Sequence, residues 1–172
     1  VEPRRDYARD RTWCFWDTEP QPFPQAVTHR WERWSVARPG QEVRAGEGAS
    51  PYLHLPADRF YAAALSEIEA CPWIELELGV RALDWRAEGE AVEVQTSAGD
   101  LRGGLVLDGR PRPPSGPDEV HLWQHFRGWR VRVDRAAFDP SSATLMDFRI
   151  SQEHGLGFVY VLPFAPDEAL VE

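Results

Sequence analysis

The sequence predicts an α/β (α+β) protein, because one strong helix signal lies among many short strand-like segments. Residues 57–70 read ADRFYAAALSEIEA and carry apolar side chains at helical spacing. Residues 73–107 contain short alternating runs between glycine turns and end in LVL, an unalternating run typical of a strand buried on both faces. Residues 121–172 contain further strand-like runs, so a second β-rich region is expected.

The N-terminal third predicts loops, a hairpin and the helix. Residues 1–24 combine the aromatic run TWCFW with the turn-rich run DTEPQPFPQ, which indicates loop structure around aromatic anchors. Residues 27–36 and 51–55 alternate like half-exposed strands, and the Gly- and Pro-containing segment between them favours a hairpin. Asp58 is the expected N-cap of the helix, and Pro72 marks its end.

Strand-like runs fill the rest of the chain. Residues 73–80 predict one strand, residues 81–104 a three-stranded meander, and residues 105–107 the buried strand. The run PRPPSGPDE at residues 111–119 indicates a hinge-like connection. One new sheet is expected beyond it, formed by the runs HLWQHFRGWRVRV, ATLMDFRIS, GFVYVLPF and EALVE.

Composition and missing motifs exclude several classes of protein. A net charge of -9 argues against nucleic-acid binding, which needs a basic face. The chain lacks an apolar run of about 18 residues, so no membrane-spanning helix is expected. It also lacks GxGxxG, P-loop, GxSxG, HExxH and CxxC motifs. Because no Met precedes Val1, we expect a fragment of a longer protein.

Neither cysteine nor histidine spacing predicts a special site. Cys14 and Cys71 are expected to be reduced, as in a cytosolic protein. His121 and His125 would lie ~13 Å apart along a strand, which is too far to share a metal ion. We therefore expect no metal site.

Several carboxylates are open to two interpretations. Asp108 and Gly109 either form a ligand-binding loop at the end of a buried strand or a plain turn. Glu2 is either a solvated carboxylate or the acid that closes a nucleotide-binding strand and accepts a ribose hydroxyl. Asp147 and Glu172 are either strand-end residues facing water or desolvated acids, and sequence does not separate these alternatives.

Two aromatic clusters also have two interpretations. Their pattern favours core residues, but together they could line a hydrophobic ligand site and offer π faces to a cation. The clusters are Trp13, Phe15 and Trp16, and then Trp123, Phe126 and Trp129.

Five runs, in order, resemble the bacterial lycopene β-cyclases of carotenoid synthesis, and the resemblance covers essentially the whole chain. The runs are RTWCFW, PYLHLPADRFYAAAL, LVLDGR, QHFRGWRV with FDPSSATLMDFR, and FVYVLPFAPDEALVE. The resemblance implies that Glu172 is the family's essential acid and that Glu2 holds the adenosine ribose of FAD. It also implies that the family's phosphate loop precedes Val1 and that its flavin-covering segment follows Glu172.

The implied fold is an FAD-binding flavoprotein of the hydroxylase/glutathione-reductase type. Residues 1–26 and 56–112 would form part of the FAD-binding domain, and residues 27–55 and 118–172 the β-rich substrate domain. The cofactor contacts implied by the resemblance are Glu2, Arg59, Asp108 and Gly109.

The implied activity is the redox-neutral conversion of lycopene through γ-carotene to β-carotene, with reduced FAD as cofactor and NADPH as reductant. Glu172 would donate the proton, and its apolar flanks would keep it neutral. Asp147 would be a second acid, a base or an orienting group, and the two aromatic clusters would line the substrate pocket. The fragment by itself is expected to be inactive.

The substrate implied by the resemblance dissolves in membranes. We therefore expect peripheral contact with the cytoplasmic face of the cell membrane. Two alternatives remain open. One is a related FAD-dependent oxidoreductase, such as a prenyl reductase or monooxygenase, and the other is a carotenoid-binding module without catalysis.

Overall fold

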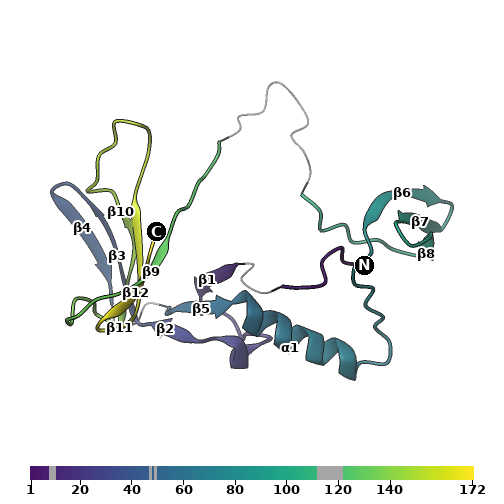
Figure 1. Ribbon diagram of the computed structural model, residues 1–172, viewed down its shortest axis with the longest axis horizontal. Coiled ribbons are helices and arrows are strands. Elements are labelled where there is room, and N and C mark those ends of the chain that lie inside the picture. The colour runs from purple at the N-terminus through teal and green to yellow at the C-terminus, as the bar shows by residue number, and fades with distance from the viewer. Residues whose placement is uncertain (8–10, 47, 49, 112–121) are drawn as a thin grey trace. The chain divides into compact units, whose positions relative to one another are not determined.

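Strands dominate the computed structural model, which contains one α-helix and three sheets in the part that it describes (Figure 1). The described residues are 1–7, 11–46, 48, 50–111 and 122–172. The chain divides into two compact units: of the described residues, 1–7, 65–111 and 122–124 belong to one, and 11–46, 48, 50–64 and 125–172 to the other. Most of the expected hinge-like connection and His121 lie outside the described residues.

The larger unit contains a six-stranded sheet in the order β4-β3-β10-β11-β12-β9. Its strands β3 and β10 are parallel, and the other neighbours are antiparallel. The strands are β3 (Arg33–Arg38), β4 (Gln41–Ala45), β9 (Trp129–Arg132), β10 (Ser142–Asp147), β11 (Val159–Ala165) and β12 (Glu168–Val171). The prediction that the last four runs of the chain share one sheet is confirmed, although β9 begins only at Trp129.

The same unit contains a three-stranded sheet in the order β1-β5-β2. Its elements are β1 (Thr12–Trp16), the short 3-10 helix η1 (Pro24–Ala26), β2 (His29–Trp31) and β5 (Tyr52–Pro56). The loop predicted for TWCFW is wrong, because these residues pair with β5 along their whole length. An aromatic run forms a strand where both of its faces meet apolar neighbours.

The hairpin predicted between residues 27–36 and 51–55 is correct only in part. The first run divides into two strands, of which β2 pairs antiparallel with β5. Strand β3 instead pairs with β4, a strand that lies within the segment predicted to be a turn. Gly40, at a φ of 77°, makes the tight turn between β3 and β4.

The core of the larger unit lies between its two sheets. Trp31, Ala143 and Leu162 are fully buried and come from β2, β10 and β11. The indole Nε1 of Trp31 donates a hydrogen bond of 2.7 Å to the carbonyl oxygen of Pro163. The inner faces of the two sheets therefore share one apolar cluster and one buried hydrogen bond.

Helix α1 (Ala57–Ala70) has the predicted bounds. It begins at Ala57, so Asp58 lies in its first turn and is not the N-cap. The ring of Phe60 packs edge-on against Trp13 and Phe23, at centroid distances of 5.1 and 5.2 Å. These contacts cover the face of β1 that points away from the six-stranded sheet.

The smaller unit contains the predicted meander, with strands β6 (Ala82–Glu88), β7 (Ala91–Thr96) and β8 (Leu101–Gly103) in that order. The predicted strand at residues 73–80 is reduced to one parallel bridge between Glu2 and Leu78. The predicted buried strand is wrong, because Leu105 and Leu107 lie outside any strand and are 77% and 89% exposed. An apolar run becomes a buried strand only where neighbouring strands supply hydrogen-bond partners for its backbone. None of the described residues forms a strand ladder with residues 105–107.

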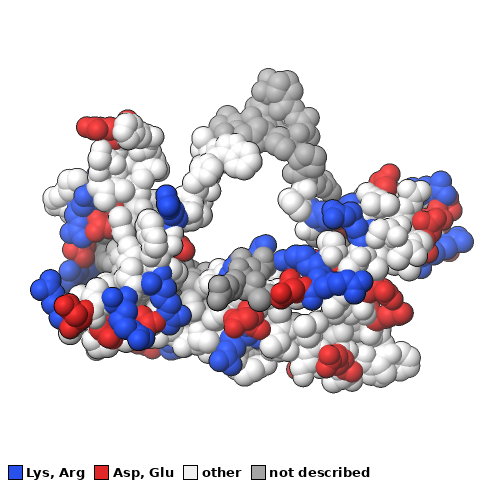
Figure 2. Space-filling model, viewed as in Figure 1, with Lys and Arg blue, Asp and Glu red and all other residues white. Residues whose placement is uncertain are grey.

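Charged side chains of both signs are interspersed over the face shown in Figure 2. Many arginines form ion pairs with nearby carboxylates, such as Arg33 with Asp139 at 2.7 Å. Exposed pairs of this kind contribute little to stability. In the part of the chain that the structure describes, no helix is long and apolar enough to cross a membrane.

We predict that Leu162→Ala lowers the free energy of unfolding of the protein that contains this chain by about 2–5 kcal/mol, because it leaves a cavity beside Trp31. Leu156→Ala is the matched control, since Leu156 is 85% exposed, and should change stability by less than ~0.5 kcal/mol. Urea unfolding followed by tryptophan fluorescence measures both. Equal effects would contradict the assigned core.

Candidate functional site

Glu172 follows β12 directly and pairs with Tyr160 of the neighbouring strand β11. The two residues exchange both backbone hydrogen bonds, with lengths of 2.7 and 2.9 Å. Residues that face each other in this way on antiparallel strands project their side chains from the same face of the sheet. The side chain of Glu172 therefore shares a face with that of Tyr160.

That face is the inner one, toward the three-stranded sheet. Strand β11 alternates, so Tyr160, Leu162 and Phe164 lie on one side, and all three belong to the core cluster around Trp31. The alternation of β12 likewise puts Leu170 and Glu172 on this side. The local strand pattern thus directs Glu172, which is half-buried, between the sheets.

The opposing sheet brings polar groups to this region. The hydroxyl of Tyr160 donates to that of Tyr52 at 3.1 Å, and Tyr160 is also hydrogen-bonded to the thiol of Cys14. Burial raises the pKa of Cys14 to about 11, and the nearby Glu172 carboxylate adds to the rise. Burial also raises the pKa of Tyr160 far above its usual range. Both groups therefore remain protonated at neutral pH.

Aromatic rings lie beside this hydrogen-bonded group. Trp16 packs against Tyr52 and Trp34, with centroid distances of 4.8 and 5.3 Å, and Trp31 lies 6.1 Å from Tyr52. Indole and phenol faces attract a positive charge within about 6 Å of the ring. A carboxylic acid beside such rings can protonate an apolar substrate and leave the resulting cation near π faces.

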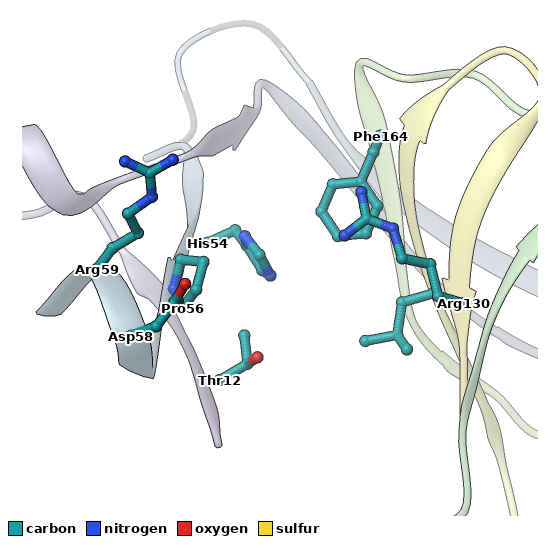
Figure 3. Close-up of a pocket in the computed structure, with 8 residues that line it drawn as sticks. Thr12, His54, Pro56, Asp58, Arg59, Arg130 and Phe164 are labelled. Carbon is teal, nitrogen blue, oxygen red and sulfur yellow. The ribbon is translucent and has the colours of Figure 1, made fainter. Parts of the chain in front are cut away.

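A cavity of about 340 Å³ opens at the other end of the inner face (Figure 3). Its lining residues are Thr12, His54, Pro56, Asp58, Arg59, Arg130, Phe164 and Leu170. The guanidinium of Arg130 lies 4.8 Å from the centre of the Phe164 ring and also pairs with Glu168. The ring of His54 points into the space between Thr12 and Arg130.

His54 is the most buried titratable group of this cavity. It is only 7% exposed, and its Nδ1 lies 2.6 Å from the hydroxyl oxygen of Thr28. Burial lowers the pKa of His54 to about 4, and the positive charges of His29 and Arg130 act in the same direction. The imidazole is therefore neutral at physiological pH.

The structure separates the aromatic residues that the sequence grouped together. Trp16 shares the inner face with Tyr52, whereas Trp13 and Phe15 line a second cavity on the other face of the three-stranded sheet, near α1. Trp129 lies opposite Val171 and so projects away from Glu172. The core interpretation is wrong for the other cluster, because Trp123, Phe126 and Trp129 are exposed.

Asp147 does not share a face with Glu172. It lies opposite Val159 at the end of β10, on the outer side of the sheet. Arg149 binds its carboxylate through Nε and Nη2, at 2.8 and 2.6 Å, and holds its pKa below the usual range. Of the two interpretations given for Asp147, the structure supports a strand-end residue and not a desolvated acid.

The residues expected to contact FAD belong to both units. In the smaller unit, Glu2 lies at an isolated parallel bridge to Leu78, and Arg4 binds its carboxylate at 2.9 Å. Asp108 lies in exposed coil, where Arg110 and Trp85 bind its carboxylate. It does not end a buried strand, which corrects that interpretation. Arg59 lines the cavity of the larger unit.

A dinucleotide site needs a phosphate-binding loop as well as an acid for the ribose, and the sequence of this chain contains no GxGxxG loop. The described residues also contain no cluster of His, Cys, Asp or Glu that could hold a metal ion. Both cysteines are free thiols, as predicted.

Sequence reasoning missed the residues that surround Glu172. Tyr160 and Tyr52 lie in runs that the sequence predicted to be strands, and each stands two residues before a residue that the structure buries, Leu162 and His54. Cys14 and Gly128 carried no such signal, because their proximity to Glu172 depends on how distant strands pair.

Comparison with known proteins gives a consistent match. The family described as lycopene cyclase protein matches residues 1–172. The chain is 27% identical to a lycopene beta-cyclase of Pseudescherichia vulneris over 180 aligned residues, covering all of this chain and 43% of the relative. It is 38% identical to one of Paracoccus sp. (strain N81106 / MBIC 01143) over 75 residues, covering 42% of this chain and 18% of the relative. A third, of Pantoea ananas, is 27% identical over 149 residues, covering 85% of this chain and 35% of the relative.

We predict that His54 makes stability fall at low pH. Its pKa is about 4 in the folded protein against an ordinary value near 6.5, so the unfolded chain binds the proton more readily. The stabilisation is complete above pH ~6.5, and on the order of 3 kcal/mol is lost as the pH falls to about 4. Urea unfolding between pH 4 and 7 measures this loss.

His54→Gln should remove this part of the pH dependence, whereas His154→Gln, at an exposed position, should keep it. Identical pH profiles for the two variants would contradict the assignment.

Proposed function

The chain belongs to the lycopene cyclase family, and on that premise we propose that the protein containing it cyclises the ψ-ends of lycopene to β-rings. The reaction is a redox-neutral isomerisation that yields γ-carotene and then β-carotene. The chain spans less than half the length of the relatives it matches, so this activity is proposed for the whole protein. The observation that carries the proposal is the half-buried Glu172, directed between the two sheets beside Tyr160, Cys14 and aromatic rings.

Glu172 is proposed as the proton donor. Its protonated carboxyl group transfers a proton to the terminal double bond of the substrate, which leaves a tertiary carbocation. None of the described residues forms an ion pair with the carboxylate of Glu172, whereas Arg130 and Arg132 both pair with Glu168.

Ring closure and proton loss complete the cycle. The neighbouring double bond attacks the cation, and the ring carbon then releases a proton, so the number of protons is unchanged. The carboxylate left on Glu172 is the base that this chain provides to accept that proton. The rings of Trp16, Trp31 and Tyr52 stabilise the intermediate positive charge.

The proposed cofactor is FAD in its reduced form, with NADPH as reductant. When bound, the reduced flavin would supply negative charge near the carbocation. Glu2 would accept a ribose hydroxyl, and Arg59 would contribute a positive charge from the cavity of the larger unit. Asp108 and Gly109 remain proposed flavin neighbours.

We also propose peripheral contact with the cytoplasmic face of the cell membrane, because lycopene is a long hydrocarbon. The larger unit exposes apolar side chains that could reach lipid, namely Val43, Phe126, Ile150 and Leu156.

We predict that Glu172→Gln lowers kcat for β-carotene formation by about 10²–10⁴-fold, because the amide cannot donate the proton. The measurement is anaerobic conversion of lycopene by the complete protein with pre-reduced FAD. Glu153→Gln, in the exposed segment after β10, is the control and should retain activity. Solvent deuterium should enter the ring without stoichiometric NADPH use. Unchanged activity in Glu172→Gln, or NADPH consumed in each turnover, would refute the proposal.

We further predict that Asp147→Asn lowers kcat by less than about 3-fold, because Asp147 lies on the outer face of the sheet and is bound by Arg149. The same assay measures it. A loss comparable with that of Glu172→Gln would instead support Asp147 as a second acid or base.

A further inference from the structure

The side chain of Glu172 lies between residues of two neighbouring strands. On one side is Tyr160 of β11, which exchanges both backbone hydrogen bonds with Glu172. On the other side, β12 pairs with β9 so that Val171 lies opposite Trp129. One residue further along the same register, Gly128 lies opposite Glu172.

Gly128 leaves the space that Glu172 occupies. A Cβ atom built on Gly128 would lie 2.3 Å from Cγ, 3.0 Å from Oε1 and 3.1 Å from Cδ of Glu172. Carbon atoms do not approach to 2.3 Å without bonding, so the Glu172 side chain lies where any side chain at position 128 would begin. The two residues are therefore complementary in shape.

The backbone itself does not demand glycine at this position. Gly128 is not among the glycines with a positive φ, in contrast to Gly40, where the turn requires one. Among the described residues, the three atoms that a Cβ at position 128 would meet first all belong to Glu172.

On the opposite side, Glu172 faces partly buried groups. Tyr160 belongs to the core cluster around Trp31, and its hydroxyl is fixed by hydrogen bonds to Tyr52 and Cys14. The phenol ring has little freedom to move. Of the two neighbours that flank Glu172, only Gly128 leaves room for its side chain.

We infer that Gly128 is a positioning residue for Glu172: the missing side chain lets the carboxyl group lie across the start of β9. The inference rests on the proposed role of Glu172 as proton donor. A methyl group at position 128 forces the side chain of Glu172 into another rotamer, which displaces the carboxyl group. The proton is then delivered from a different place relative to the substrate.

Gly128→Ala should fold normally. The atoms in conflict belong to the flexible side chain of Glu172, so a change of rotamer relieves the conflict. The displacement of a reacting group by about 1 Å can lower a rate by ~10²-fold, so the effect should appear in catalysis.

The test uses the complete protein with Gly128→Ala and with Gly46→Ala as matched control. Gly46 has no positive φ, and a Cβ atom there would meet nothing within 4 Å. In Gly128→Ala we expect kcat for lycopene cyclisation to fall by about 10–100-fold, with KM within about 3-fold of the unsubstituted protein. Gly46→Ala should change neither parameter.

A second readout does not depend on activity. The ¹³C carboxyl resonance of Glu172, assigned by its absence in Glu172→Gln, should move in Gly128→Ala and stay in place in Gly46→Ala. An unmoved resonance, an unchanged kcat, or a rise in KM alone would overturn the positioning role. If the unsubstituted protein converts no lycopene while the resonance moves, the proposed function fails but the contact between Gly128 and Glu172 stands.

Discussion

The buried indole of Trp31 is the interaction on which the larger unit depends. It fills the space between the two sheets against Leu162 and Ala143, and its Nε1 donates to the carbonyl oxygen of Pro163. Pro163 lies in a central strand, where proline is normally unfavourable because it offers no backbone N–H. Here the register of β11 against β12 shifts directly after Pro163. The irregularity in the strand pairing therefore coincides with the residue whose carbonyl oxygen accepts the hydrogen bond from Trp31.

This packing decides which side of the six-stranded sheet can carry chemistry. Once Leu162 faces Trp31, strand alternation turns Tyr160 and Glu172 inward and Asp147 outward. A shift of β12 by one residue would turn Glu172 to the outer face of the sheet. The candidate site is thus a consequence of the core, and its acid is held by the same backbone hydrogen bonds that hold the sheet.

Polar side chains inside the larger unit form hydrogen bonds with one another and carry no charge at neutral pH. Tyr52, Tyr160 and Cys14 share hydrogen bonds, and His54 is neutral against Thr28. Buried groups that remain unpaired cost stability, and among the described residues no buried side-chain nitrogen or oxygen lacks a partner.

The sequence by itself determined the elements with strong local signals. Helix α1, the meander β6-β7-β8 and the four C-terminal strands follow from periodicity, turns and flanking residues, and Glu172 was singled out by resemblance to a family. Only the tertiary structure decided which strands pair. Pairing made a strand of the aromatic run Thr12–Trp16 and left residues 105–107 exposed. It also brought Cys14, Tyr52 and Gly128 close to Glu172. The alternation within one strand assigns its residues to two faces, but the strands that pack against it decide which of these faces is buried.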